Sequence, residues 1–278
     1  MSAELFPDTT RPVTIEEGLA EACAVIERAV LEEGPIETIF LMLSGGNDSM
    51  VLLDALHDQA DEIVHINTGI GIPETNEFVR WVVDAMGYPL TELHPPRSYE
   101  SIVMDPKLFG GFPGPGLHHF AYTRLKERPL RKLLADRRTK RGQRFMLLTG
   151  IRNAESARRM GYGSHVNRKG GQVWVNPLLR WSNELMAEYR VTRNLPVNPV
   201  SAHLHMSGEC LCGAFAHPGE MDEIAFFYPE FAARIAALEA QVEAAGLPNC
   251  KWGERPTKRG AVPAGPMCAQ CTLWDEAA

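Results

Sequence analysis

The sequence predicts an α/β protein with a doubly wound, mostly parallel sheet and a small Cys-rich subdomain at the C-terminal end. Apolar runs of strand length alternate with amphipathic, helix-like segments up to residue 200, a pattern typical of parallel strands joined by helical crossovers. Beyond residue 200 the alternation stops, and five of the six cysteines lie in the last third of the chain. We therefore expect an N-terminal helix (1–36), an α/β domain (37–200) and a Cys-rich helical subdomain (201–278).

The elements follow in order along the chain. Residues 14–33 have apolar side chains at helical spacing and end at Gly34-Pro35, which predicts a helix. Helices are also expected over 50–60, 73–87 and 229–245, with Pro73 suited to a first turn. Buried strands are expected over 37–44, 62–69, 89–95 and 144–150. The insertion 99–143 contains GGFPGPG (110–116), which predicts a loop; His118 and His119 follow it, either as ligand contacts or as solvated side chains.

Composition and charge limit the classes of protein and partner. The 278 residues are 45% hydrophobic and 23% charged, enough for a globular core. No apolar run approaches the roughly 18 residues of a membrane helix, and the N-terminal residues lack the pattern of a secretion signal, so we expect a cytoplasmic protein without a membrane partner.

The net charge of −7 conceals an uneven distribution. Residues 124–169 contain 15 basic and three acidic side chains, so the remainder of the chain sums to −19. The basic stretch is either a solvated helix face or a surface for a polyanion such as tRNA, DNA or a bisphosphorylated nucleotide. The size of the excess favours a nucleic acid.

Polar or glycine-rich turns follow the predicted strands, at the edge where α/β sheets bind ligands. The segment Ser44-Gly45-Gly46-Asn47-Asp48-Ser49 lies between a strand and a helix. Its glycines allow backbone N–H groups to converge, and the helix N-terminus adds partial positive charge. Ser44 and Ser49 supply hydroxyls, and Asp48 can orient the loop or hold Mg²⁺. An anion, typically a phosphate, is expected here; the alternative is an ordinary capped turn.

These segments resemble the PP-loop ATP pyrophosphatases, in particular the phosphoadenosine phosphosulfate (PAPS) reductase branch. The match comprises S-G-G-x-D-S at 44–49, N-T-G at 67–69 with P-E-T at 73–75, G-x-R-x-x-E-S-x-x-R at 150–159, and N-P-L-L-x-W at 176–181. Asn67 stands where the branch usually has Asp. The resemblance implies an adenine nucleotide alpha hydrolase-like fold that cleaves ATP between the α- and β-phosphates. It also implies nucleotide contacts at Asn67, Thr68, Gly69 and Gly150, and phosphate contacts at Arg152 and Arg159, as guanidinium groups bind phosphate bidentately.

The cysteines predict a metal site. Cys210 and Cys212 form a C-x-C pair, and Cys268 and Cys271 form a C-x-x-C pair. Four thiolates suit Zn²⁺ or a [4Fe–4S] cluster, and the resemblance favours the cluster. Cys250 is a persulfide carrier, a substitute ligand or an inert residue. Cys23 lies on the apolar side of the first helix and is expected in the core.

The motif of sulfonucleotide reductases, E-C-G-[LI]-H, is absent, because Cys210 lies in G-E-C-L-C-G. We therefore predict an ATP pyrophosphatase that adenylates tRNA or DNA for sulfur insertion, with ATP, Mg²⁺ and a sulfur donor such as a cysteine desulfurase. Asp48, Arg152 and Cys250 are the expected catalytic residues. The alternatives are a PAPS or adenosine phosphosulfate reductase and a nucleotide-binding scaffold subunit, the latter because Asn47 stands where many relatives carry Lys.

Overall fold

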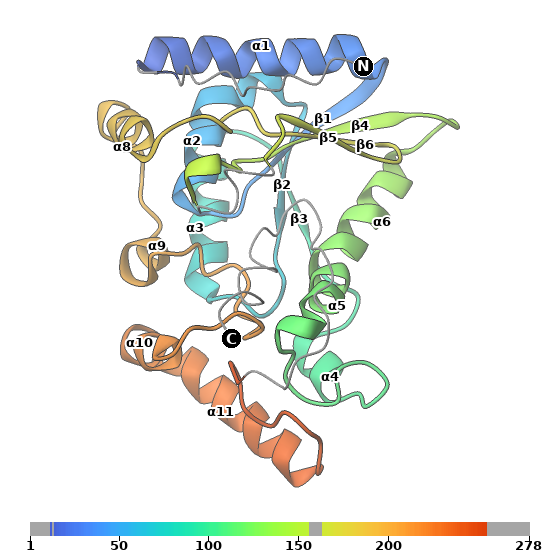
Figure 1. Cartoon of the computed structure of the whole chain (residues 1–278), viewed down its shortest axis with the longest axis vertical. Helices are drawn as coiled ribbons and strands as arrows, with labels where there is room; N and C mark the ends of the chain where they lie inside the picture. The colour runs from blue at the N-terminus through green and yellow to red at the C-terminus, as the bar shows by residue number, and fades with distance from the viewer. Residues whose placement is uncertain (1–11, 13, 156–162, 255–278) are drawn as a thin grey trace. The chain divides into compact units, whose positions relative to one another are not determined.

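The computed structural model describes residues 12, 14–155 and 163–254 (Figure 1). The chain forms two compact units that alternate along the sequence. One contains Met1–Met42, Asp48–Asp61 and Gly142–Pro196, and the other contains Leu43–Asn47, Glu62–Arg141 and Val197–Ala278. No helix in the described part of the chain has both the length and the apolar character needed to cross a membrane.

The six-stranded sheet has the order β3-β2-β1-β4-β6-β5. Its strands are β1 (Ile36–Met42), β2 (Glu62–Ile66), β3 (Leu90–Leu93), β4 (Arg144–Leu148), β5 (Val166–Lys169) and β6 (Gln172–Val175). The pairs β1–β4, β4–β6 and β2–β3 are parallel, which confirms the predicted α/β class. Strands β5 and β6 form an antiparallel hairpin that the sequence analysis did not predict. Strand β5 is too polar to be recognised, since most of its side chains are exposed.

The first unit carries α1 (Ile15–Glu33), most of α2 (Asn47–Leu56) and α8 (Asn183–Thr192). Thr14 and Glu17 form a capping box that starts α1, and Gly34, with a φ of 76°, ends it. Helix α1 packs against β6 and α8 (Figure 1). The contact is close at Gly18, where an added Cβ would lie 2.7 Å from the buried ring of Trp181.

The second unit contains nine short or medium helical segments among its described residues. They are α3 (Pro73–Ala85), α4 (Tyr99–Val103), the 3-10 turn η2 (Pro115–Leu117), α5 (His118–Tyr122), the π-helical turn η3 (Thr123–Glu127), α6 (Arg128–Arg137), α9 (Pro199–Leu204), α10 (Glu220–Phe227) and α11 (Pro229–Ala244). GGFPGPG is irregular up to Gly114, as predicted, whereas much of the remaining insertion is helical. The predicted helix at 229–245 is confirmed as α11.

One apolar core holds the second unit together. It joins Tyr99 and Phe112 of the insertion to Phe231 of α11 and to Trp252. Cys212 belongs to this core, and Cys210 and Cys250 pack against it. The described residues therefore do not show a separate Cys-rich subdomain, and Cys268 and Cys271 lie outside them.

Candidate functional site

The predicted phosphate loop connects β1 to α2. Gly45 has a φ of 79°, a left-handed conformation that favours glycine. The Gly46 amide donates to Ser44 Oγ over 3.3 Å, and α2 begins at the next residue, Asn47. The loop thus turns its backbone into a helix N-terminus, the arrangement that binds anions in strand–turn–helix motifs.

Asn198 connects the phosphate loop by hydrogen bonds to the segment that contains Cys210 and Cys212. Its side chain is buried, and Nδ2 donates to the Gly45 carbonyl over 3.0 Å, to Thr75 Oγ1 over 3.2 Å and to the Ser207 carbonyl over 3.3 Å. Its Oδ1 accepts from the Val200 amide and caps α9. The Thr75 hydroxyl donates to the same Ser207 carbonyl over 2.6 Å. One amide therefore sets the position of the phosphate loop relative to residue 207.

The turn after β2 holds the same segment by its backbone. The buried Thr68 hydroxyl donates to the Glu209 carbonyl over 2.6 Å. The Leu211 amide donates to the Ile70 carbonyl over 2.8 Å, and an added Cβ on Gly71 would lie 2.5 Å from the Glu209 carbonyl oxygen. The segment 206–212, which we call the cysteine loop, is thus packed directly on residues 68–72.

The neutral Asn67 side chain both accepts and donates a hydrogen bond. Its Oδ1 accepts from the Gly69 amide over 3.1 Å, and its Nδ2 donates to Glu92 Oε1 over 2.8 Å. Hydrogen bonds from Arg80, and then from Asn67, lower the pKa of Glu92 to about 2 in spite of its burial. An Asp at position 67 would place a second carboxylate against Glu92, which accounts for the departure from the usual residue.

Asp48 and Arg152 form an ion pair in the first unit. Arg152 Nε and Nη2 donate to the two carboxylate oxygens of Asp48 over 2.9 and 3.1 Å. Nη1 donates to the Trp181 carbonyl over 3.2 Å and to Asn183 Oδ1 over 3.1 Å, and the side chain is only 6% exposed. Arg152 therefore acts as the counter-ion of Asp48. A direct phosphate contact by Arg152 stays a prediction, and Arg159 lies outside the described residues.

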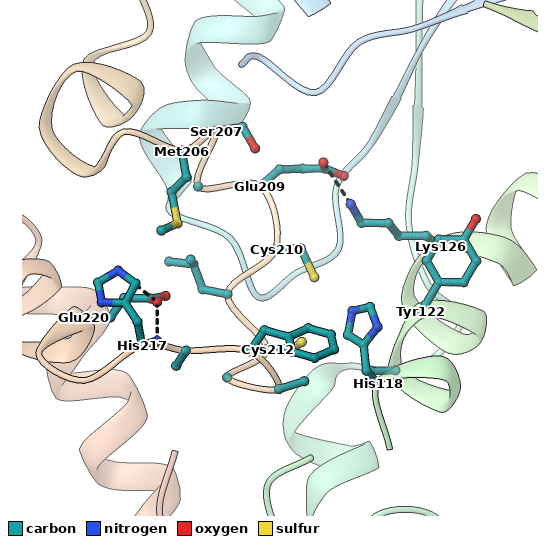
Figure 2. A pocket seen from close by; sticks show the side chains of 17 residues that line it. His118, Tyr122, Lys126, Met206, Ser207, Glu209, Cys210, Cys212, His217 and Glu220 are labelled. Carbon is teal, nitrogen blue, oxygen red and sulfur yellow. Dashed lines mark hydrogen bonds and ion pairs between the residues drawn. The ribbon is translucent and has the colours of Figure 1, made fainter. Parts of the chain in front are cut away.

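A cavity of about 310 Å³ opens beside the cysteine loop. Figure 2 shows Cys210 and Cys212 facing His118, Tyr122 and Lys126 across it. Lys126 Nζ lies 3.1 Å from Glu209 Oε2, and both side chains are largely buried. His118 thus contributes to a cavity wall, and a ligand contact by His118 stays a prediction.

The surroundings of Cys210 favour its thiolate form. A hydrogen bond from Cys212 lowers the pKa of Cys210 to about 7, against the opposing effect of burial, and the positive charge of Lys126 adds to the lowering. The cysteine loop is held on its far side as well, because the Tyr99 hydroxyl donates to the Cys212 carbonyl over 2.7 Å. The arrangement presents a rigid pair of thiols to a cavity.

Only two of the four predicted metal ligands, Cys210 and Cys212, lie at this cavity. Cys210 and Cys212 share the cavity, but within residues 12, 14–155 and 163–254 no three or more His, Cys, Asp or Glu side chains form a group that could hold a metal. Cys250 packs against the apolar core and does not line the cavity. Cys23 was expected in the core, but it is only partly buried in α1 and is not one of the buried core residues, although burial raises its pKa.

A family model, the phosphoadenosine phosphosulfate reductase domain, matches residues 38–207. The chain belongs to this family. The matched segment includes the phosphate loop, the turn after β2, Arg152 and Asn198, and it ends at Ser207, the second residue of the cysteine loop. No curated protein matches the chain.

Several solved structures are similar to this family member in fold. A phosphoadenylyl-sulfate (PAPS) reductase from Candida auris is 17% identical over 69% of this chain and 92% of its own, with a TM-score of 0.46. The U34-tRNA thiolase NcsA from Methanococcus maripaludis, which has a [4Fe–4S] cluster, is 16% identical over 82% and 80%, with a TM-score of 0.46. An NH3-dependent NAD synthetase from Campylobacter jejuni is 15% identical over 88% and 99%, with a TM-score of 0.45.

Sequence reasoning missed the residues that connect this family member's motifs. Asn198 and Lys126 were not identified, and Glu209 was noted only as the neighbour of Cys210. The Asn-Pro step at 198–199 is a signal for a helix start, and it would have marked Asn198 as a cap. Nothing local to the sequence indicates that Asn198 Nδ2 reaches Gly45, because 153 positions separate them.

Proposed function

We propose that this member of the PAPS reductase domain family cleaves ATP between the α- and β-phosphates to activate an acceptor for sulfur insertion. The observation that carries the proposal is the attachment of the cysteine loop to the phosphate loop through Asn198 and Thr75. A site that activates with ATP and then delivers sulfur needs both groups in fixed relation, because positioning supplies much of the rate.

The phosphate loop binds the leaving pyrophosphate. Backbone amides at Gly45 and Gly46 and the positive end of α2 stabilise charge that develops when the α–β bond breaks. An acceptor oxygen attacks the α-phosphorus, and pyrophosphate leaves. Mg²⁺, when bound, supplies further neutralisation, and Asp48 is the carboxylate of the loop that could contact it. Arg152 orients the Asp48 carboxylate through its two hydrogen bonds.

Cys210 and Cys212 carry the sulfur. Cys210 takes a sulfane sulfur as a persulfide from a donor such as a cysteine desulfurase, and the terminal sulfur attacks the adenylated acceptor. Cys212 then attacks the inner sulfur, so that a Cys210–Cys212 disulfide forms, the transferred sulfur stays on the acceptor, and AMP leaves. An external thiol reductant restores the dithiol. Lys126, paired with Glu209, holds positive charge beside the persulfide.

The steps above use Cys210 and Cys212 as free thiols, so they exclude the predicted [4Fe–4S] cluster, in which the same two cysteines are ligands. The cavity supplies two thiols, and a [4Fe–4S] cluster would also require Cys268 and Cys271. An absorbance spectrum after anaerobic purification tests this, since a cluster gives a broad shoulder near ~400 nm that bleaches on reduction. A colourless protein with stoichiometric zinc would assign the same ligands to Zn²⁺.

Two variants test whether the phosphate loop cleaves ATP and the cysteine loop transfers sulfur in separate steps. Cys210→Ser is expected to abolish transfer of ³⁵S to the acceptor while ATP still releases pyrophosphate. Cys23→Ser, in α1, is the matched control and should leave both readouts unchanged. Loss of pyrophosphate release and sulfur transfer together in Cys210→Ser would contradict separate activation and sulfur steps. No pyrophosphate release from the wild type with any nucleic acid would instead support a scaffold subunit.

A second function is favoured by the Glu209-Cys210 step and its cavity. In a sulfonucleotide reductase the Cys210 thiolate would attack the sulfate sulfur of PAPS or adenosine phosphosulfate, and the bound thiosulfonate would then release sulfite as a disulfide forms with Cys212. ATP has no part in this reaction. Sulfite release from PAPS with a dithiol reductant, without ATP turnover, would establish it and refute the preferred proposal.

A further inference from the structure

Phe120, Arg124 and Arg128 lie on the outer face of the helical segment formed by α5, η3 and α6, whose inner face lines the cavity. His118, Tyr122 and Lys126 point into the cavity (Figure 2), so residues 120, 124 and 128 fall on the opposite side of α5, η3 and α6. The guanidinium of Arg124 lies over the ring of Phe120, 5.5 Å from its centroid. Phe120 is 48% exposed, and Arg128 is exposed.

Arg124 has a buried donor group. Its Nε is inaccessible to solvent and has no hydrogen-bond partner among the residues that the structure describes. Burial, followed by the positive charges of Arg128 and Arg97, lowers the pKa of Arg124, and Asp105 opposes this. Asp105 itself is bound to Arg97 Nη1 over 3.0 Å. The guanidinium groups of Arg97, Arg124 and Arg128 therefore lie near a single carboxylate, Asp105. A bound anion would reduce the repulsion among these positive charges.

Neighbouring cations of the same stretch are compensated. Lys132 pairs with Asp136 over 2.6 Å, and Arg131 pairs with Glu127 over 2.8 Å. Arg137 lies 2.9 Å from Glu62. The large formal charge of residues 124–144 is thus reduced along α6 by carboxylate partners.

We propose that Arg124 and Arg128, in the field of Arg97, bind a backbone phosphate of a nucleic-acid strand, with Phe120 stacking on an adjacent base. Guanidinium groups bind phosphate bidentately, and an exposed ring beside a cation is the usual platform for unpaired bases. This inference rests on the proposed function, in which the acceptor is a nucleic acid, and it selects a few residues of the basic stretch as the contact.

The test is fluorescence anisotropy of a labelled single-stranded 20-nucleotide RNA with the full chain, at several salt concentrations and without ATP. For a single strand, loss of one phosphate contact reduces the slope of log affinity against log salt by about 0.7, which is about fivefold in affinity at 0.1 M salt. Arg124→Gln and Arg128→Gln should each show this loss. Lys132→Gln removes the same charge from an ion-paired residue and should change affinity less than about twofold.

Phe120→Ala separates a strand from a small anion. It should weaken RNA binding but leave competition by inorganic phosphate unchanged, because only a base stacks on the ring. Equal losses in Arg124→Gln and Lys132→Gln would overturn the proposal, as would complete displacement of RNA by millimolar inorganic phosphate, which would indicate a free-anion site. Pyrophosphate release is measured on the same variants in a separate assay. Normal RNA binding by Arg124→Gln refutes this site alone, whereas absent pyrophosphate release in the wild type refutes the proposed function.

Discussion

Replacing Asn198 by Ala tests whether one buried amide couples the phosphate loop to the cysteine loop. The Ala variant loses the cap of α9, worth about 1 kcal/mol. It also removes the Nδ2 donor from the Gly45 carbonyl, which costs about 1–2 kcal/mol when a buried acceptor is left unpaired. The Ser207 carbonyl keeps its bond from Thr75. We therefore expect a loss of about 2–3 kcal/mol in the free energy of unfolding.

Urea unfolding followed by tryptophan fluorescence measures this loss, and calorimetry measures pyrophosphate binding to the folded variant. Pyrophosphate affinity should fall about tenfold, the equivalent of one hydrogen bond. Asn198→Ser restores a capping hydroxyl but not the reach to Gly45, so stability should recover by about 1 kcal/mol while affinity stays low.

Ser182→Ala provides the matched control, because Ser182 caps α8 through the Leu185 amide and has no part in the loops. It should lose about 1 kcal/mol and bind pyrophosphate as the wild type does. A folded Asn198→Ala protein with wild-type pyrophosphate affinity would refute the coupling.

Three further predictions concern the turn after β2 and its surroundings. Gly71→Ala places a Cβ 2.5 Å from the Glu209 carbonyl oxygen, so it should destabilise the fold by about 1–3 kcal/mol in urea unfolding; an unchanged midpoint would contradict the close packing. Asn67→Asp sets a carboxylate against Glu92 and should cost about 1–2 kcal/mol at pH 7, with a smaller cost at pH 4, where one carboxylate is protonated. Because the pKa of Glu92 is lowered from 4.5 to about 2, its pair with Arg80 stabilises the fold above about pH 5 and loses this effect as the pH falls towards 2. Half-exposed Arg80 reduces the contribution to ~1–2 kcal/mol, so Arg80→Gln should shrink the acid-induced loss, and an identical acid profile would exclude the pair.

The sequence was sufficient for the fold class, for strands β1 to β4, for helices α1, α2, α3 and α11, and for the strand–turn–helix arrangement of the phosphate loop. Segments such as 37–44 and 62–69 are short, nearly continuous apolar runs of strand length. Buried parallel strands have this pattern, so they could be recognised without a structure. Strand β5 was missed because its exposed Arg168 and Lys169 do not look like a strand. The helices of the insertion were missed because GGFPGPG dominates its local pattern.

The residues of the candidate site could be predicted only where they lie close together in the sequence. Cys210 and Cys212 were identified from their spacing, but their cavity partner Lys126 lies 83 positions from Glu209, and nothing local relates them. Likewise, Asp48 and Arg152 were predicted as two separate phosphate-binding residues, whereas the structure pairs them with each other. Long-range pairing of this kind depends on the packed chain, and a single sequence does not encode it in a readable pattern.

The most direct test of the account is ³¹P NMR of wild-type protein with ATP, Mg²⁺, total RNA and a sulfane sulfur donor, beside a parallel reaction containing PAPS and a dithiol reductant. The account predicts that AMP and pyrophosphate form from ATP, and that no adenosine bisphosphate forms from PAPS. Adenosine bisphosphate from PAPS, with ATP left intact, would contradict it.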